Sequence, residues 1–335
     1  MNKKSSNYFQ LCIVLLVFFL DSNPARSADW SPTQTVEFVV PAGAGGALDQ
    51  VGREVQQFFI KNQNLKTQMI VVNKGGANGK IAFDFLKQKT GDPHYLTINT
   101  TGYMSNYLIG NLDILPHREM TPIAILQDEF LVLAVRADSP LKDFSEVIQK
   151  LKNDPTSLRI AVATSIGNHI HVGTAKVLKV AGVDITKIVV VPFRSSSDSV
   201  LAMIGGHIEL VAATTPNVVS MLQAGKIRLL TVSSDKRLGG VFSNIPTWRE
   251  SGADSDFHST LGILAARGLT TEQVDFWENF FKNLSSSKEW KSFLEKNQSQ
   301  SHFVATKDTT NYYEKEFIGV KEIVGDLKLL GKVRN

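Results

Sequence analysis

The chain has 335 residues, one cysteine and a formal net charge of +4. This length fits one large domain or two of ordinary size, and a core of that size can form without disulfides. The charge is spread along the chain without a basic stripe or interleaved aromatic residues, which argues against a nucleic-acid partner.

The N-terminal segment, residues 1–28, has the order of a secretory signal peptide. Two lysines precede an apolar stretch at 11–20, and small residues suited to cleavage lead up to Ala28. The apolar stretch is shorter than the roughly 20 residues that cross a membrane. We therefore expect a soluble periplasmic protein. Cleavage also removes Cys12, the only cysteine, so the mature chain has neither a disulfide nor a thiolate metal ligand.

Between Val36 and Phe59 a buried-strand pattern leads through a glycine-rich turn into an amphipathic helix. Gly43, Gly45 and Gly46 leave the backbone bare at the start of this helix. Unpaired amide groups at the positive end of the helix dipole favour an anion such as phosphate or carboxylate. The spacing completes neither the dinucleotide fingerprint nor a phosphate loop. A tight turn without a ligand remains the alternative.

Short strand-like runs alternate with helical segments through the rest of the chain. Many of these runs are continuously apolar, which is typical of a sheet covered by helices on both faces, so the pattern predicts an α/β fold. The expected strands are 69–72, 95–99, 123–126, 131–135, 159–163, 188–191, 208–213 and 227–232. The expected helices are 79–87, 143–151, 169–180, 199–204, 218–223, 271–284 and 288–296.

Two apolar extended segments near residues 130 and 232 enclose a complete α/β set and are candidates for hinge strands. The chain would leave a first domain, build a second and return, which leaves a cleft between them. This organisation predicts a discontinuous domain 1 from 29–129 plus 233–335, and a domain 2 from 130–232.

The segment 164–168 follows a strand and opens a helix, which repeats in the second half the device found at the first glycine-rich turn. Other short polar residues also follow strands, and ligands in such folds bind at the carboxyl ends of strands. The candidate ligand-binding residues are Ala42, Gly43, Ala44, Gly45, Gly46, Asp49, Thr100, Thr101, Thr164, Ser165, Gly167, Asn168, His171, Arg194, Ser195, Thr214 and Thr215.

Each of these side chains also has an ordinary structural explanation. Ser195 can simply cap a helix, and Arg194 can be a solvated charge. His169 and His171 lie about 200 degrees apart on a regular helix, so they cannot chelate one metal. No Gly-x-Ser-x-Gly elbow offers a nucleophile. We expect no metal, no cofactor and no catalytic residue.

The first loop resembles a family pattern. Pro41, Ala44-Gly45-Gly46 and Asp49 resemble the Pro-x-x-Ala-Gly-Gly-x-x-Asp motif of the Bug receptors, the extracytoplasmic solute-binding proteins of tripartite tricarboxylate transporters. The segment 73–79 resembles the family's Asn-Arg-Pro-Gly-Ala-Gly-Gly. Further matching stretches in the family's order are 137–140, 167–171, 205–206, 224–226, Arg237 and 245–247.

The resemblance implies a two-domain periplasmic binding protein of type II-like fold, with a ligand cleft between domains joined by two crossover strands. It implies a small carboxylate ligand, a di- or tricarboxylate or similar, held largely by backbone amides, hydroxyls and water and delivered to a membrane permease. We expect a monomer. A sensor that presents its ligand to a signalling partner and an exported hydrolase remain alternatives.

The chain departs from the family pattern in four loops. Lys74-Gly75 replaces Arg-Pro, Asn168 stands where a serine is usual, 194–196 replaces the usual Tyr-Lys-Gly, and 259–262 lacks the common tryptophan before glycine. Because loop side chains set selectivity while amides bind anions in general, these changes concern the identity of the ligand and not the fold.

The signal-peptide interpretation has a direct test. N-terminal sequencing of the protein recovered from the periplasm should give a start near Ala28 or Asp29, because the small-residue cleavage site ends there. Recovery of the periplasmic protein with Met1 intact would contradict it.

Overall fold

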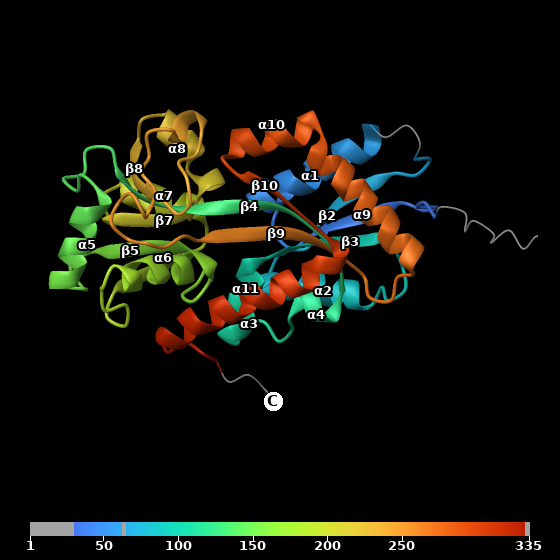
Figure 1. The fold of residues 1–335 in the computed structure, drawn as a ribbon, viewed down its shortest axis with the longest axis horizontal. Coiled ribbons are helices and arrows are strands. Elements are labelled where there is room, and N and C mark those ends of the chain that lie inside the picture. The colour runs from blue at the N-terminus through green and yellow to red at the C-terminus, as the bar shows by residue number, and fades with distance from the viewer. Residues whose placement is uncertain (1–29, 62–64, 332–335) are drawn as a thin grey trace, which may run out of the picture.

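The computed structural model describes residues 30–61 and 65–331, so the expected signal peptide lies outside the described residues. The chain forms two α/β lobes that lie end to end and are joined by two long central strands (Figure 1). None of the described helices is long and apolar enough to cross a membrane. The predicted α/β fold with two lobes joined by crossover strands is confirmed.

The first lobe has parallel strands at its outer edge and antiparallel strands toward the centre. β1 pairs parallel with β2 and β3, while β9 pairs antiparallel with β3 and β4. The strands are β1 (Val36–Val40), β2 (Met69–Asn73), β3 (Tyr95–Thr100), β9 (His258–Ala265) and β10 (Gln300–Ala305). The helices are α1 (Ala47–Lys61), the 3₁₀ turn η1 (Ala77–Gly79), α2 (Lys80–Lys87), α3 (Thr101–Leu108), α4 (Pro116–Glu119), α9 (Thr271–Ser286), α10 (Lys288–Asn297) and α11 (Thr306–Asp326).

The second lobe repeats this plan on a smaller scale. β5 pairs parallel with β6 and β7, and β7 and β8 both pair antiparallel with β4. The strands are β5 (Arg159–Ala163), β6 (Val189–Phe193), β7 (Leu210–Thr214) and β8 (Ile227–Val232). The helical segments are α5 (Phe144–Asn153), α6 (His169–Val180), α7 (Ser196–Ile204), η2 (Thr215–Asn217), α8 (Val219–Gln223) and η3 (Gly240–Phe242).

One strand belongs to both lobes. β4 (Thr121–Arg136) runs for 16 residues, pairs with β9 and β10 along its first part and with β7 and β8 along its second. The expectation of two separate strands at 123–126 and 131–135 is therefore wrong. The polar residues Gln127, Asp128 and Glu129 interrupt the apolar run in the sequence but not the strand.

The second crossing is made by β9. The segment 227–232, expected as the second hinge strand, forms β8 inside the second lobe, where Val232 lies opposite Val132 of β4. The chain then stays on that lobe through residues 233–257, and Trp248 and Phe257 are buried in its core. The domain boundaries drawn from the sequence stay predictions, and this packing favours a return to the first lobe near residue 258.

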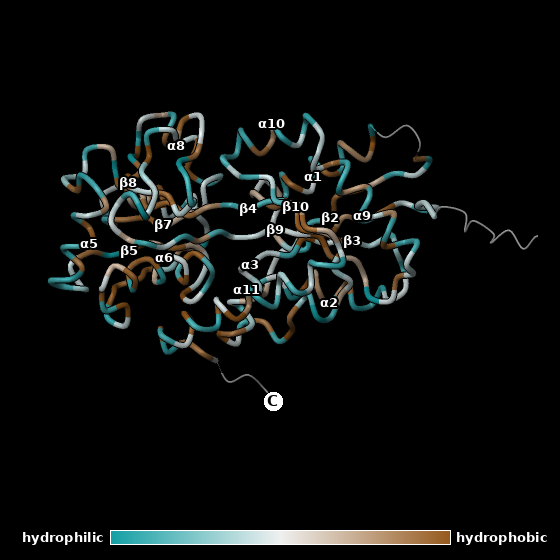
Figure 2. The backbone as a smooth tube through the Cα atoms, viewed as in Figure 1, coloured by the Kyte–Doolittle hydropathy of each residue, from teal (hydrophilic) through white to brown (hydrophobic). Residues whose placement is uncertain are grey.

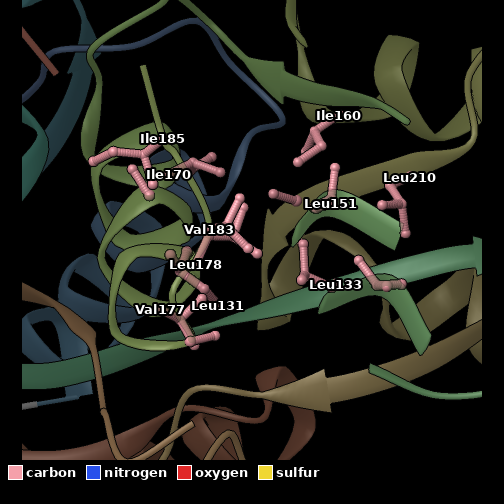
Figure 3. Packing of buried hydrophobic residues seen from close by; sticks show 14 of the residues in the cluster. Leu131, Leu133, Leu151, Ile160, Ile170, Val177, Leu178, Val183, Ile185 and Leu210 are labelled. Carbon is pink, nitrogen blue, oxygen red and sulfur yellow. The ribbon is translucent and has the colours of Figure 1, made fainter. Parts of the chain in front are cut away.

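Each lobe has its own apolar core. The close view in Figure 3 shows Leu133 of β4, Leu151 of α5 and Ile160 of β5 converging in the second lobe. In the first lobe, the aromatic residues of α9 pack against α1, and the buried Trp277 donates from Nε1 to the carbonyl of Pro93 at 2.9 Å. The hydropathy colouring in Figure 2 shows hydrophobic stretches inside each lobe and polar positions on many outer turns.

The last helix, α11, packs on both lobes. Its N-terminal half buries Tyr313 in the first lobe, while Val320, Ile323 and Val324 lie in the same apolar cluster as Val177 of α6 in the second. Figure 1 shows α11 passing beside α3 toward α6. α11 thus covers one side of the junction between the lobes.

Gly262 on β9 tests how tightly the N-terminal half of α11 packs on the first lobe. A Cβ atom there would meet the Tyr313 hydroxyl and lie 2.7 Å from the carbonyl oxygen of Ala124. Because a backbone atom cannot move aside cheaply, Gly262→Ala should lower the free energy of unfolding by about 2 kcal/mol. Urea unfolding with intrinsic fluorescence measures this.

Gly319 on α11 provides the matched control. Its Cβ position is open, and it sits within a helix, so Gly319→Ala should raise the free energy of unfolding by about 0.5–1 kcal/mol. Equal stabilities for the two variants would show that β9 and α11 are not in close contact.

Candidate functional site

A cavity of about 700 Å³ lies between the lobes, and both lobes and the crossover strands line it. The first lobe contributes two glycine-rich loops, 41–48 and 75–79, and the start of α3. The second contributes the loops after β5, β6 and β7. Glu129 of β4 and Ser259 of β9 also line it. This is the cleft that the sequence predicts between two domains.

The loop between β1 and α1 is held by Asp49. One carboxylate oxygen of Asp49 accepts from the Gly45 backbone amide at 2.8 Å and from Arg53 Nε at 2.8 Å, and the other accepts from Asn73 Nδ2 at 2.9 Å. Gly45 has a φ of +83°, a conformation that favours glycine. Asp49 and Gly45 therefore shape the loop, and neither lines the cavity.

The environment of Asp49 favours its ionised form. Burial acts to raise its pKa, but the hydrogen bonds from Arg53, the Gly45 amide and Asn73 outweigh burial and hold the pKa below its ordinary value. A charged acceptor stays fixed under the loop at neutral pH.

Two other glycines complete the first-lobe wall. Gly46 has an ordinary φ, and a Cβ there would meet nothing nearer than the Gly43 carbonyl oxygen at 3.8 Å, so the space in front of it is the cavity itself. Gly75 lies against the first loop, because its Cβ would stand 2.9 Å from the Gly43 nitrogen. The loop 75–79 thus supports the first loop and lines the cleft beside it.

The loop between β5 and α6 is fixed by its own side chains. Asn168 caps α6 by accepting from the His171 amide at 3.0 Å, and it donates from Nδ2 to the Ala163 carbonyl. The Gly167 amide donates to His171 Nδ1 at 2.9 Å. Burial lowers the pKa of His171 to about 4, so the ring is neutral and able to accept.

His169, not His171, reaches the cavity. Burial lowers the pKa of His169 to about 4 as well, so it also lines the cleft as a neutral ring, close against Gly102. On the opposite side, Ser195 both lines the cavity and caps α7 by accepting from the Asp198 amide at 3.1 Å. The capping alternative for Ser195 is thus correct and compatible with a place in the cleft.

The structure brings ten of the candidate residues to the cavity wall: Ala42, Gly43, Ala44, Gly46, Thr100, Thr164, Asn168, Arg194, Ser195 and Thr214. Seven others are not part of that wall: Gly45, Asp49, Thr101, Ser165, Gly167, His171 and Thr215. The hydroxyl of Thr101 accepts from the Thr260 amide at 3.0 Å, and that of Thr215 accepts from the Phe130 amide at 3.5 Å. These two hydroxyls hold the strand ends together.

Sequence reasoning missed the residues of the cleft that lie on the crossover strands and on α3. Glu129, Ser259 and Asn106 all line the cavity. Glu129 is buried, accepts from Gln127 Nε2 at 3.4 Å, and has its pKa raised by burial to about 7, with hydrogen bonds from Thr214 and Gln127 acting the other way. An acidic residue inside a long apolar run was the signal that could have found it.

No group of three or more histidine, cysteine, aspartate or glutamate side chains that could hold a metal occurs within residues 30–61 and 65–331. The polar groups of the cleft are backbone amides, hydroxyls, asparagine side chains, the ring of His169, the carboxyl group of Glu129 and one arginine at the exposed rim. Most of them are hydrogen-bond donors. Such groups suit an organic anion held by hydrogen bonds.

Two α/β lobes joined by crossover strands, each presenting a helix start to one cavity, are the architecture of a solute-binding protein. The chain belongs to the tripartite tricarboxylate transporter receptor family, whose family model matches residues 51–329.

Several known proteins are similar to the chain. A UPF0065 protein encoded in the gbd 5′ region of Cupriavidus necator is 26% identical over 313 residues, which cover 92% of this chain and 93% of the relative. Rpa4515 of R. palustris, solved with adipate, has a TM-score of 0.79 at 23% identity, and the match covers 89% of this chain and 98% of the Rpa4515 chain. MatC of Rhodopseudomonas palustris, solved with bound malate, has a TM-score of 0.74 at 22% identity, and the match covers 88% of this chain and 100% of MatC.

The role of Asp49 can be tested through stability. Asp49→Asn should lower the free energy of unfolding at pH 7 by about 1–2 kcal/mol, because a buried charged acceptor of the loop is lost. The folded-state pKa of Asp49 lies below its unfolded value of about 3.9. Its contribution is therefore present above pH 4 and is lost as the pH falls through the folded-state pKa.

Urea titrations at pH 7 and at pH 3 measure both effects. The gap between wild type and variant should shrink at the lower pH. Asp275→Asn, the same charge change at an exposed position of α9, should stay within about 0.5 kcal/mol of wild type. A gap that does not change with pH would contradict a stabilising carboxylate.

Proposed function

We propose that this protein is a periplasmic receptor that captures a small organic carboxylate in the cleft and delivers it to the membrane permease of a tripartite tricarboxylate transporter. The observation that carries the proposal is the pair of helix starts, α1 from one lobe and α6 from the other, beside one cavity. The fold of solved relatives that hold adipate and malate supports a ligand of this class.

Backbone amides at the two helix starts bind the carboxylate in this proposal. Gly43 and Gly46 bring no Cβ atom that would keep an anion away, and the dipoles of α1 and α6 favour negative charge at that point. Arg194, exposed at the rim, attracts the anion as it enters. A volume of about 700 Å³ is in the ordinary range for a small-molecule site.

The candidate residues divide into two roles. Those on the cavity wall contact the ligand or its bound waters. Asp49, Gly45 and His171 position the loops from behind, because their hydrogen bonds are made to the loop backbone. The neutral rings of His169 and His171 add no charge to the site.

Exchange of ligand requires the lobes to move apart. The pairing of one lobe passes into that of the other along β4, and the chain returns to the first lobe at the start of β9. Bending at these two points opens the cleft without unfolding either core. We propose that the receptor acts as a monomer, without cofactor or metal, and catalyses no reaction.

The proposal is tested by ligand screening followed by one substitution. Thermal-shift measurements of the mature protein with mono-, di- and tricarboxylates identify the best ligand, since a ligand at 100 times its dissociation constant adds about 2.7 kcal/mol. Gly46→Val should then keep the melting temperature of wild type and weaken binding tenfold or more by calorimetry, because the new side chain occupies the space in front of the loop.

Gly239→Val is the matched control. Gly239 also has an open Cβ position and an ordinary φ, and it lies outside the cleft, so the variant should keep both stability and affinity. If no carboxylate raises the melting temperature of wild type, the proposed function is wrong. If Gly46→Val binds normally, the ligand lies elsewhere in the cleft.

A further inference from the structure

The inner wall of the cleft is formed by the crossover strands and carries an acidic residue. Glu129 lies on β4 opposite Ser259 of β9, and both line the cavity. Glu129 is only 9% exposed, so its carboxyl group sits at the back of the cleft and not at its rim. An acid in this place is unexpected in a site that binds anions.

Glu129 accepts from Gln127 and Thr214, while two other buried side-chain oxygens, those of Gln127 and Asn106, lack a donor. Gln127 uses its amide nitrogen to donate to Glu129 at 3.4 Å, and its Oε1 is buried without a partner. Asn106, 8% exposed on the cavity wall, has an Oδ1 that is likewise buried without a partner. Gln127 is not part of the cavity wall, but Asn106 is, and a buried acceptor left unpaired is costly. A bound molecule that donates to Asn106 therefore gains free energy.

The charge of Glu129 also lacks compensation in the described part of the chain. The one charge that acts on it is the like charge of Asp128, its neighbour on β4. Three other titratable groups line the cavity: Arg194, which is exposed at the rim, Tyr103, a phenol whose pKa is raised by burial, and His169, a neutral ring with a pKa lowered to about 4 by burial. Burial raises the pKa of Glu129 to about 7, which is the response of a carboxyl group held without a cation.

We propose that Glu129 is a specificity-determining residue that selects a carboxylate ligand carrying a protonated nitrogen. The ligand carboxylate binds at the helix starts of α1 and α6, and its ammonium group donates to Glu129 and to the unpaired Oδ1 of Asn106, both on the cavity wall. An ammonium group has three N–H donors and a positive charge, which suit the two carboxylate oxygens of Glu129 and the Oδ1 of Asn106. This inference rests on the proposed function.

A simple dicarboxylate fits this inner wall poorly. Its second carboxylate would face Glu129, and two like charges in a buried site disfavour each other unless one takes up a proton. The cleft can therefore reject dicarboxylates that match the rest of the site, because repulsion against a competing ligand contributes to specificity as a favourable contact does.

Calorimetry with matched ligand pairs tests the assignment. The mature protein is titrated at pH 8.0, where Glu129 is mostly ionised, with three pairs that differ only in carboxylate against ammonium: succinate and β-alanine, glutarate and 4-aminobutanoate, adipate and 5-aminopentanoate. In the pair that binds best, the amino carboxylate should bind at least tenfold more tightly than the dicarboxylate.

Glu129→Gln should weaken the amino carboxylate at least tenfold and bring the two affinities together or reverse them. Glu322→Gln, the same charge change at an exposed position of α11, should leave both affinities unchanged. Melting temperatures show whether each variant folds. If Glu129→Gln does not fold, the ranking of the pairs in wild type still decides.

The outcomes separate this inference from the proposed function. A wild-type protein that binds the dicarboxylates as tightly as their amino partners, or tighter, overturns the role of Glu129 and leaves carboxylate capture standing. A ratio that is the same in wild type and Glu129→Gln also overturns it. Absence of binding by every ligand of the three pairs and of the carboxylate screen overturns both.

Discussion

The structure depends on one strand that two sheets share. β4 forms hydrogen bonds with β9 in the first lobe and with β7 and β8 in the second, so neither sheet is complete without it. Because the helix starts follow strands of both sheets, this shared strand also fixes which loops face each other. The position of the cleft is therefore a result of strand pairing, and the residues at the change of partners, around Glu129, become its inner wall.

The loops of the cleft are organised from behind. Asp49 holds the first loop and His171 holds its counterpart, and both accept from loop amides while leaving the front of each loop bare. Such an arrangement keeps the amides that face the cavity in position before any ligand arrives, which reduces the free energy spent on ordering them during binding. Side chains that do not hold the loops can then determine which ligand the cleft selects.

The sequence predicts the α/β fold, most of the strands and the starts of both α1 and α6. Buried parallel strands are continuously apolar, and a glycine-rich turn or a capping residue marks each of these helix starts. The sequence does not predict β9, in which Ser259, Thr260 and Gly262 interrupt the apolar pattern, or the continuity of β4 through Gln127 and Glu129. Those polar residues are buried because they face a cleft formed by distant segments. The local sequence pattern also cannot distinguish a loop residue that lines the cavity from one that holds the loop backbone in place, as Asp49 does.

The two faces of the junction are not equivalent, because α11 lies across one of them. Val320, Ile323 and Val324 are at most 7% exposed where α11 meets α6, and Tyr313 anchors the same helix in the first lobe. Separation of the lobes along that face would expose this apolar surface to water, at about 25 cal/mol for each Å². In the proposed opening of the cleft, rotation of the lobes about an axis along α11 keeps this apolar surface buried. We therefore expect solute to enter and leave on the face that α11 does not cover.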